Sequence, residues 1–257
     1  MDLAHQTKGH GPTVVFLHAG IADSRMWEPQ WESFAGHYRL LRCDLAGFGR
    51  TPLDGLRVAY AQDVVELLDG LGAASAGLIG ASLGGRVALE VAVGRPDLVA
   101  KLVLVDSGLP GLDWSEDVRR YGAAEDEAVA RGDLEAATEL NLRMWVDGPR
   151  RAAKDVDPMV RAAVAEMQRR ALEVQAPHWE ELEEDMLVPD VAARLGEVEA
   201  PTLVLVGEED VDEMQALARR FAAEIPVARM ASIPGAAHLP SLEQPAVFDE
   251  LVLGFLS

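Results

Sequence analysis

Short apolar runs alternate along the chain with longer segments whose apolar residues recur at helical spacing. The runs predict strands at 13–17, 38–43, 76–79, 101–105, 202–206 and 228–233, and the longer segments predict helices at 56–71, 84–93, 214–224 and 245–256. Strands that are apolar along their whole length are buried on both faces. The alternation therefore predicts an α/β fold, with a mostly parallel sheet that helices cover on both sides.

The segment 110–195 interrupts this alternation. It contains no convincing strand, is rich in Ala, Glu and Arg, and carries widely spaced aromatic residues, so we expect about four helices there. Prolines mark the expected joints between them: Pro149, Pro158, Pro177 and Pro189. We expect residues 1–109 and 196–257 to form the core, and residues 110–195 to form a helical lid inserted between two strands.

Composition excludes several kinds of partner. The 257 residues carry a formal net charge of −20, which would repel nucleic acid and anionic membrane surfaces. No run approaches the roughly 20 apolar residues of a membrane span, and residues 1–10 have neither a signal-peptide core nor a transit pattern, so we expect a cytoplasmic protein. The single cysteine, Cys43, closes a predicted strand, where we expect a buried structural thiol. The sequence makes no prediction of the oligomeric state.

The segment Gly80-Ala81-Ser82-Leu83-Gly84 lies between a predicted strand and a predicted helix. A sharp strand-to-helix turn at Ser82 would lift its hydroxyl off the backbone and crowd the residues two positions to either side. Glycine at both of those positions removes the clash. We therefore interpret Ser82 as a candidate nucleophile, against the alternative of a serine that caps the following helix.

A serine hydroxyl becomes a good nucleophile when an imidazole takes its proton and a carboxylate orients that imidazole. Asp210 follows the predicted strand 202–206, and His238 follows 228–233. Because the carboxyl ends of parallel strands share one edge of a sheet, we expect both side chains to meet Ser82 there. Other acids near strand ends stay open as the partner of His238: Asp106, Glu208, Glu209 and Asp212.

With this serine, acid and histidine in this order, the chain resembles the α/β-hydrolase superfamily, in particular its lid-bearing serine esterases and lactonases. The resemblance spans nearly the whole chain and implies the α/β-hydrolase fold, with no cofactor and no metal. The family's oxyanion loop corresponds to His18-Ala19-Gly20, where Ala19 replaces the usual glycine. An alanine fits at this position if its φ is negative. The resemblance implies that the amides of Gly20 and Leu83 donate to the oxyanion.

The expected substrate is a small-molecule ester or lactone of a small, largely apolar carboxylic acid. We expect three side chains to contact it, one beside Gly20, one in the lid and one beside His238: Ile21, Trp145 and Leu239. The segment 21–31 and the position of the lid resemble enol-lactone hydrolases, which favours lactones.

Related functions stay open. C–C bond hydrolases of this fold commonly carry asparagine before the serine and tryptophan after the histidine, where this chain has Ala81 and Leu239. Cofactor-free perhydrolases tend to carry a proline in the oxyanion loop, where Ile21 stands next to Gly20. A small-ligand-binding protein of the same fold, without turnover, is the alternative from another class.

Structural roles are expected for the other notable residues. Asp44 begins a segment, 44–50, that resembles a structural turn of the family, and the glycines there lack phosphate-loop spacing. We expect Trp27 and Trp31 in the core, and the acidic run 180–185 on a solvated face without metal ligands. Each of six larger lid residues is expected to pack within the lid, although some of them must face Ser82. These residues are Trp114, Tyr121, Met144, Trp145, His178 and Trp179.

Overall fold

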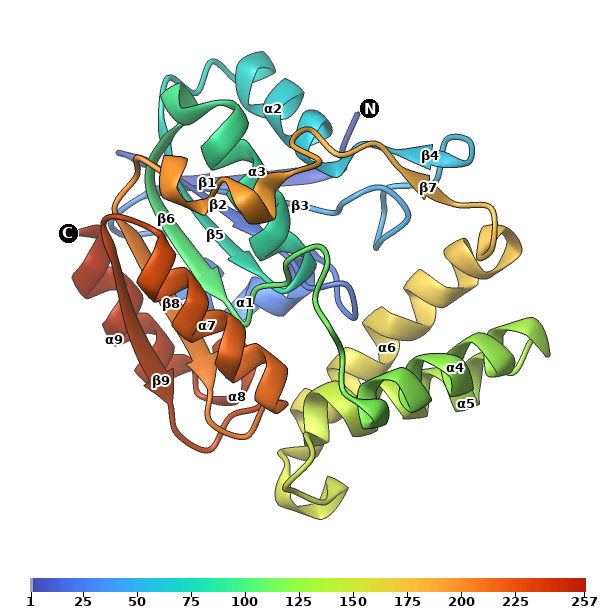
Figure 1. The fold of residues 1–257 in the computed structure, drawn as a ribbon. Helices are drawn as coiled ribbons and strands as arrows, with labels where there is room; N and C mark the ends of the chain where they lie inside the picture. Colours follow the sequence, from blue (N-terminus) through green and yellow to red (C-terminus); the bar gives the residue numbers. More distant parts are fainter. Residues whose placement is uncertain (1) are drawn as a thin grey trace.

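A seven-stranded sheet forms the centre of the molecule in the computed structural model, which describes residues 2–257 (Figure 1). The strand order is β1-β3-β2-β5-β6-β8-β9, and only β1 runs antiparallel to its neighbour. The strands are β1 (His5–Gly9), β2 (Thr13–Leu17), β3 (Arg39–Cys43), β5 (Ala76–Ala81), β6 (Val99–Val105), β8 (Thr202–Gly207) and β9 (Ala228–Ile233). Every predicted strand is confirmed, whereas β1 was not predicted.

Alternate residues of the strands point to opposite faces of the sheet and enter two separate apolar cores. Val15 and Leu17 pack with α2 (Tyr60–Gly70), α3 (Leu83–Gly94) and α7 (Asp212–Glu224). Val14 and Phe16 pack on the other face, where Trp27 and Trp31 are buried as expected. The helices of that face are α1 (Glu28–Ser33), α8 (Pro240–Glu243) and α9 (Pro245–Leu256). The predicted α/β architecture with both faces covered is therefore present.

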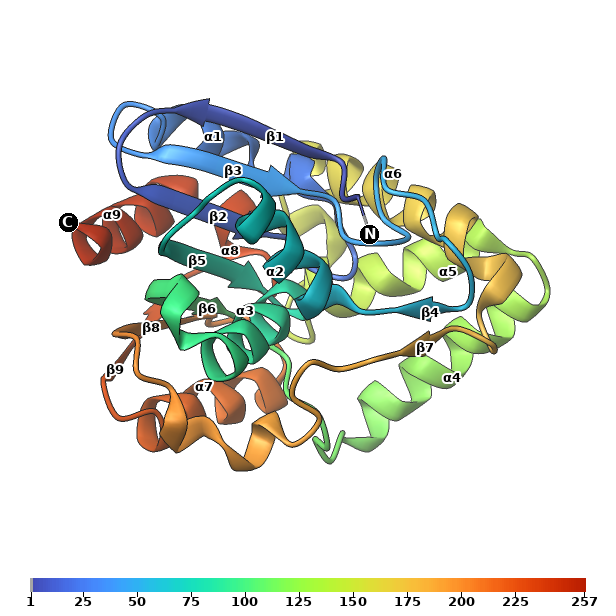
Figure 2. The same cartoon turned by 90° about the horizontal axis from the view of Figure 1, so that it is seen from above.

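A group of helices between β6 and β8 lies beyond the carboxyl ends of the strands (Figures 1 and 2). It consists of α4 (Glu116–Ala130), α5 (Leu134–Asn141), a π-helical turn (Leu142–Asp147) and α6 (Pro158–Gln175). Pro158 starts α6, and Pro149 follows the π-helical turn, so both stand at joints. At the end of the segment the chain returns to the core, where the Val188 N–H donates to the buried Glu90 of α3 at 3.2 Å.

The expectation that segment 110–195 contains no strand is wrong. A short strand β7 (Glu183–Glu184) pairs with β4 (Arg57–Val58) in a separate two-stranded sheet. The acidic run is exposed at this point, as expected, but Arg57 forms ion pairs with Glu183 and Asp185. Two-residue strands have no sequence periodicity, which explains the omission. None of the helices described in residues 2–257 is long and apolar enough to cross a membrane.

Candidate functional site

Ser82 lies at the turn between β5 and α3, with φ 50° and ψ −110°. A non-glycine residue in such a conformation stores about 1–3 kcal/mol of strain that the surrounding structure must hold in place. A Cβ atom on Gly80 would lie 2.2 Å from the carbonyl oxygen of Gly84, and one on Gly84 would lie 2.3 Å from that of Leu17. The expected crowding on both sides of Ser82 is present, and only glycine fits at either position.

The loop after β2 passes directly beside Leu83. A Cβ atom on Gly20 would lie 3.7 Å from the Leu83 Cβ atom, and the Gly84 N–H donates to the His18 carbonyl oxygen at 3.0 Å. Leu83 is the first residue of α3, and N–H groups in the first turn of a helix have no partner within it. The structure thus brings the segments of Gly20 and Leu83 together, as two donors to one oxyanion require.

His18 fixes the shape of this loop. Its Nε2 accepts a hydrogen bond from the Leu45 N–H at 2.9 Å, so the proton of the neutral ring is on Nδ1, which donates to the Ala19 carbonyl at 2.8 Å. Burial lowers the pKa of His18 below its usual value, which favours this neutral form. Ala19 has a negative φ, because only Ser82 and Asp106 among the described non-glycine residues have positive values.

Asp210 and His238 meet at the carboxyl edge of the sheet. The His238 Nδ1 lies 2.7 Å from the Asp210 Oδ2, and both side chains are almost fully buried. The Asp210 Oδ1 also accepts the Val211 N–H at 2.8 Å. With Nδ1–H donated to the carboxylate, Nε2 is the ring nitrogen that can accept a proton. Ser82 stands at the end of β5, within the same row of strand ends as β8 and β9.

The other acids do not take the place of Asp210. Glu208 is exposed and accepts from the Ser232 hydroxyl, and Asp212 is exposed and pairs with Arg150. Asp106 is buried at the end of β6, where its carboxylate accepts the Gly207 N–H at 3.1 and 3.3 Å. Asp210 is thus the acid that hydrogen bonds to His238 within residues 2–257.

Asp106, Asp210 and His238 offer ligand-type atoms that all lie within 4.8 Å of one another. The spacing does not fit a tetrahedral zinc site, in which two ligands about 2.1 Å from the metal would be about 3.4 Å apart. The 2.7 Å between the His238 Nδ1 and the Asp210 Oδ2 is a hydrogen-bond distance. The cluster is therefore one of hydrogen-bonded side chains.

The helical segment 110–195, which keeps the name lid below, is attached to the loop that carries Asp210 and to the loop that carries His238. The Trp145 carbonyl accepts the His238 N–H at 3.2 Å, and the Trp145 ring lies 4.6 Å from the imidazole, centroid to centroid. Arg150 donates to the Asp210 carbonyl at 2.8 Å. A Cβ atom on Gly148 would lie 2.6 Å from the Glu209 carbonyl oxygen, so the backbones are in direct contact.

Arg151 holds the loop before His238 through several bonds. It donates to the carbonyl oxygens of Asp147, Val146 and Gly235 at 2.9, 2.7 and 2.8 Å, and it pairs with Glu243 at 2.7 Å. Glu243 in turn accepts the Ala237 N–H at 2.8 Å. Arg150, Arg151 and Glu243 were not predicted from the sequence. No motif signals them, because most of their partners are backbone atoms.

The three expected substrate contacts lie in different surroundings. Trp145 is half-buried and touches His238. Ile21 is 7% exposed beside Gly20, whereas Leu239 is fully buried and packs in the core with Phe248. In this conformation Leu239 has no exposed surface to offer a substrate.

The lid aromatics form a cluster around Trp145. Its Nε1–H donates to the Tyr121 hydroxyl at 3.0 Å, and the Trp114 ring meets it edge-on at 6.2 Å. Trp179 packs at the α4–α5 cluster and donates to Asp126. Beside Trp145, a cleft of about 590 Å³ opens between the lid and the Asp210 loop, with an apolar part formed by Tyr121, Val118, Leu140, Met144 and Val211.

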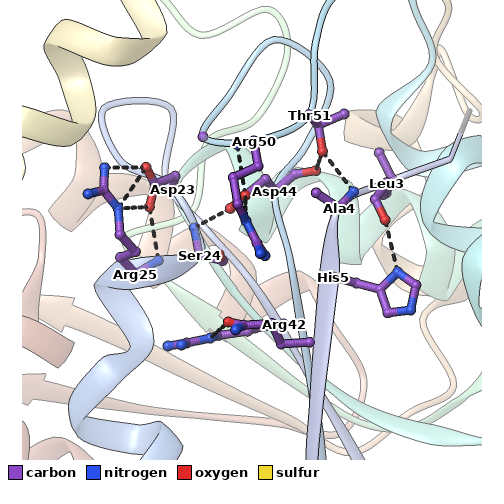
Figure 3. A network of polar contacts seen from close by, with 12 residues as sticks. Leu3, Ala4, His5, Asp23, Ser24, Arg25, Arg42, Asp44, Arg50 and Thr51 are labelled. Atoms are coloured by element: carbon purple, nitrogen blue, oxygen red, sulfur yellow. Dashed lines mark hydrogen bonds and ion pairs between the residues drawn. The ribbon is translucent and has the colours of Figure 1, made fainter.

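Asp44 braces the turn after β3, as expected (Figure 3). Its carboxylate accepts the N–H groups of Ser24 at 2.9 Å and of Arg50 at 3.0 Å, and its carbonyl accepts the Thr51 hydroxyl at 2.7 Å. Burial alone would raise the pKa of Asp44, but the bonds from Ser24 and Arg50 lower it below its usual value. Gly49, at φ 52°, leaves no room for a Cβ atom next to this carboxylate.

Comparisons with known proteins find similarities along nearly the whole chain. Residues 14–251 match the family described as "Alpha/beta hydrolase family". The chain is 29% identical to a pimeloyl-[acyl-carrier protein] methyl ester esterase of Nitrosospira multiformis, over 99% of this chain and 98% of that one. It is 25% identical to a carboxylesterase of Bacillus subtilis, over 95% and 80%. A solved structure titled "Est816 as an N-Acyl homoserine lactone degrading enzyme" superposes with a TM-score of 0.77 at 25% identity, over 98% and 96%.

Proposed function

Since the chain belongs to the α/β-hydrolase family and is a hydrolase of that type, we propose that it cleaves esters or lactones of small, largely apolar carboxylic acids through an acyl-enzyme on Ser82. One observation carries the proposal. The His238 ring is bound through Nδ1 to the buried Asp210, at the sheet edge where the strained Ser82 turn lies. We place the enzyme in the cytoplasm as part of the same proposal.

In the first half of the reaction, Ser82 Oγ attacks the carbonyl carbon of the substrate while His238 Nε2 takes the hydroxyl proton. The carbonyl oxygen becomes an oxyanion, which accepts hydrogen bonds from the amides of Gly20 and Leu83; each such donor lowers the barrier by about 3 kcal/mol. His238 then gives its proton to the leaving oxygen as the carbon–oxygen bond breaks. An ester releases an alcohol at this step, whereas a lactone leaves a hydroxyl at the far end of the acyl chain.

In the second half, water attacks the acyl-enzyme carbonyl and His238 takes a proton from it. Collapse of the intermediate returns that proton to Ser82 Oγ and releases the carboxylic acid. Asp210 keeps the imidazole in the tautomer with the proton on Nδ1 and stabilises the imidazolium that forms twice in the cycle. Every proton in this sequence passes through side chains already in the chain, so the mechanism calls for no cofactor.

Two features support an uncharged, apolar substrate. The Trp145 ring lies against His238, and Ile21 follows Gly20, so the groups beside the proposed reaction centre are apolar. The net charge of −20 repels anionic substrates as they approach the protein. The similarity to a lactone-degrading enzyme favours lactones within this class.

Labelling with a fluorophosphonate, followed by hydrolysis of p-nitrophenyl acetate, tests the proposal. We expect the label on Ser82 and a loss of hydrolysis in Ser82→Ala of about 10³-fold or more. Ser232→Ala is the matched control, because Ser232 is exposed at the end of β9 and its hydroxyl donates to the exposed Glu208. An unlabelled Ser82, with Ser82→Ala as active as the parent, would overturn the proposal.

The preference for lactones has a separate test. We expect kcat/KM for γ- and δ-lactones to exceed that for the open-chain methyl esters of the same acids. Turnover of the esters without turnover of any lactone would restrict the function to ester hydrolysis.

A further inference from the structure

Two buried carboxyl groups lie side by side at the ends of neighbouring strands. Asp106 follows β6 and is 2% exposed, and Asp210 follows β8 and is fully buried. One carboxyl oxygen of each acid lies within 4.8 Å of the other and of a ring nitrogen of His238. Two carboxylates this close in a dry site do not both ionise, so one of them holds a proton.

The hydrogen-bond donors decide which acid is charged. Asp210 receives two well-formed bonds, from the His238 Nδ1–H at 2.7 Å and from the Val211 N–H at 2.8 Å. Within residues 2–257, the Asp106 carboxyl group receives a single donor, the Gly207 N–H, which is divided between its two oxygens at 3.1 and 3.3 Å. Donors stabilise the charged form of a carboxyl group, so the negative charge belongs on Asp210 and the proton on Asp106.

The other charged groups around the pair act in the same direction. Burial raises the pKa of Asp106 well above its usual value, and the negative charge of Asp210 adds to this effect, as does that of Glu243 from α8. Arg151 pairs with Glu243, and Arg150 donates to the Asp210 carbonyl oxygen. In the described part of the chain, neither guanidinium bonds to the Asp106 carboxyl group.

The backbone at Asp106 is also unusual. Asp106 has φ 41°, and Ser82 is the other non-glycine residue with a positive φ within residues 2–257. Such strain persists where the surroundings over-determine a conformation, and it is concentrated at functional sites. Aspartate and asparagine tolerate this region better than most residues.

We propose that Asp106 is a positioning residue, which stays protonated at neutral pH and donates a hydrogen bond to Asp210. The bond holds the Asp210 carboxylate in the orientation that receives His238 Nδ1–H, and it leaves a single negative charge behind the imidazole. Asp106 touches no reacting atom and acts through Asp210. This inference rests on the proposed function, because Asp210 matters only if His238 acts as the base.

Two substitutions separate this role from simple packing. Asp106→Asn keeps a donor toward Asp210, an oxygen for the Gly207 N–H and a preference for positive φ, so it mimics the protonated acid. Asp106→Gly accepts the same backbone conformation but removes the donor. With p-nitrophenyl acetate, we expect kcat of Asp106→Asn to stay within about threefold of the parent, and kcat of Asp106→Gly to fall about 100-fold with little change in KM, as for a misplaced catalytic group.

The pH profile of kcat/KM gives the second readout. We expect the midpoint of the acid limb to be unchanged in Asp106→Asn, because no charge is lost. An ionised Asp106 predicts the opposite, since loss of a negative charge beside the imidazole would move the acid limb to lower pH. That shift, or full activity in Asp106→Gly, would overturn the proposal.

A third measurement does not depend on activity. The infrared difference spectrum at pH 7 between the parent and Asp106→Asn should contain a protonated-carboxyl carbonyl band that belongs to the parent. Absence of that band would overturn the proposal even if Asp106→Gly fails to fold. If Ser82 takes no fluorophosphonate in the parent, the proposed function fails, and the infrared band still reports the state of Asp106.

Discussion

Substitution of Arg151 by methionine tests how strongly the lid is bound to the loop before His238. The Arg151 and Glu243 side chains are 12% and 5% exposed, and they form an ion pair at 2.7 Å. The guanidinium also donates to three backbone carbonyls, two in the lid and one at Gly235. Methionine fills much of the same volume but leaves Glu243 as a buried charge without its partner.

The structure sets the expected magnitude. Removal of one partner from a buried ion pair destabilises a protein by about 3–5 kcal/mol, because the remaining charge is left in a dry site. For a chain of this length each kcal/mol lowers Tm by about 2–4 °C, so Arg151→Met should lower Tm by about 6–20 °C. The measurement is urea unfolding followed by tryptophan fluorescence, together with calorimetry.

The pH dependence provides a further check. Burial raises the pKa of Glu243 above its usual 4.5, although Arg151 opposes this effect, so loss of Arg151 should raise that pKa further. The folded state then binds more protons than the unfolded state above pH 4.5, and its stability falls as the pH rises. We therefore expect the loss in Arg151→Met to be larger at pH 8 than at pH 5, and to shrink when Glu243→Gln is added.

A matched control is Arg120→Met, since Arg120 is 68% exposed and pairs with the exposed Glu116 and Asp117. It should change the free energy of unfolding by less than about 1 kcal/mol. The reasoning about Arg151 is refuted if Arg151→Met loses no more than this control, or if its loss is the same at both pH values.

Three further predictions concern residues at the carboxyl edge of the sheet. Asp210→Asn should lower kcat by about 10⁴-fold with little change in KM. Its control, Glu208→Gln, should change kcat by less than about twofold. Equal effects of the two substitutions would show that Asp210 is not the acid that orients His238. Gly84→Ala should lower Tm or prevent folding, because its Cβ would lie 2.3 Å from a backbone oxygen, whereas Gly254→Ala, with open space around it, should not. The pKa of Asp44 is lowered in the folded state, so its carboxylate stabilises the fold above pH 3.8 and this contribution is lost as the pH falls through the lower folded pKa. Asp44→Asn should therefore flatten the acid-unfolding profile. An unchanged profile would contradict the bracing role of Asp44.

The core of the fold was predictable because its strands are continuous apolar runs in the sequence. Val14 to Leu17 are apolar in sequence, and the structure shows why, since alternate residues enter different cores. The strand β1 was not predictable in this way, because its residues are mostly exposed and polar at the edge of the sheet. Its place follows from antiparallel pairing with β3, which is a tertiary contact.

The candidate site was predictable where it depends on strand ends. Ser82, Asp210 and His238 each follow a recognisable strand, and parallel topology brings those ends to one edge. The lid contacts were not predictable, because they use backbone groups that any sequence supplies. The Trp145 carbonyl accepts the His238 N–H, and Arg151 donates to the Gly235 carbonyl. Leu239 was expected to contact substrate, and it lies fully buried in the core with Phe248.

The most direct test of the central claim is to trap the acyl-enzyme. Rapid quenching during p-nitrophenyl acetate turnover, followed by intact mass measurement and peptide mapping, should find one acetyl group per chain, located on Ser82. A burst of one p-nitrophenol per chain should accompany it. Steady hydrolysis without an adduct on Ser82, and at an undiminished rate in Ser82→Ala, would contradict the claim.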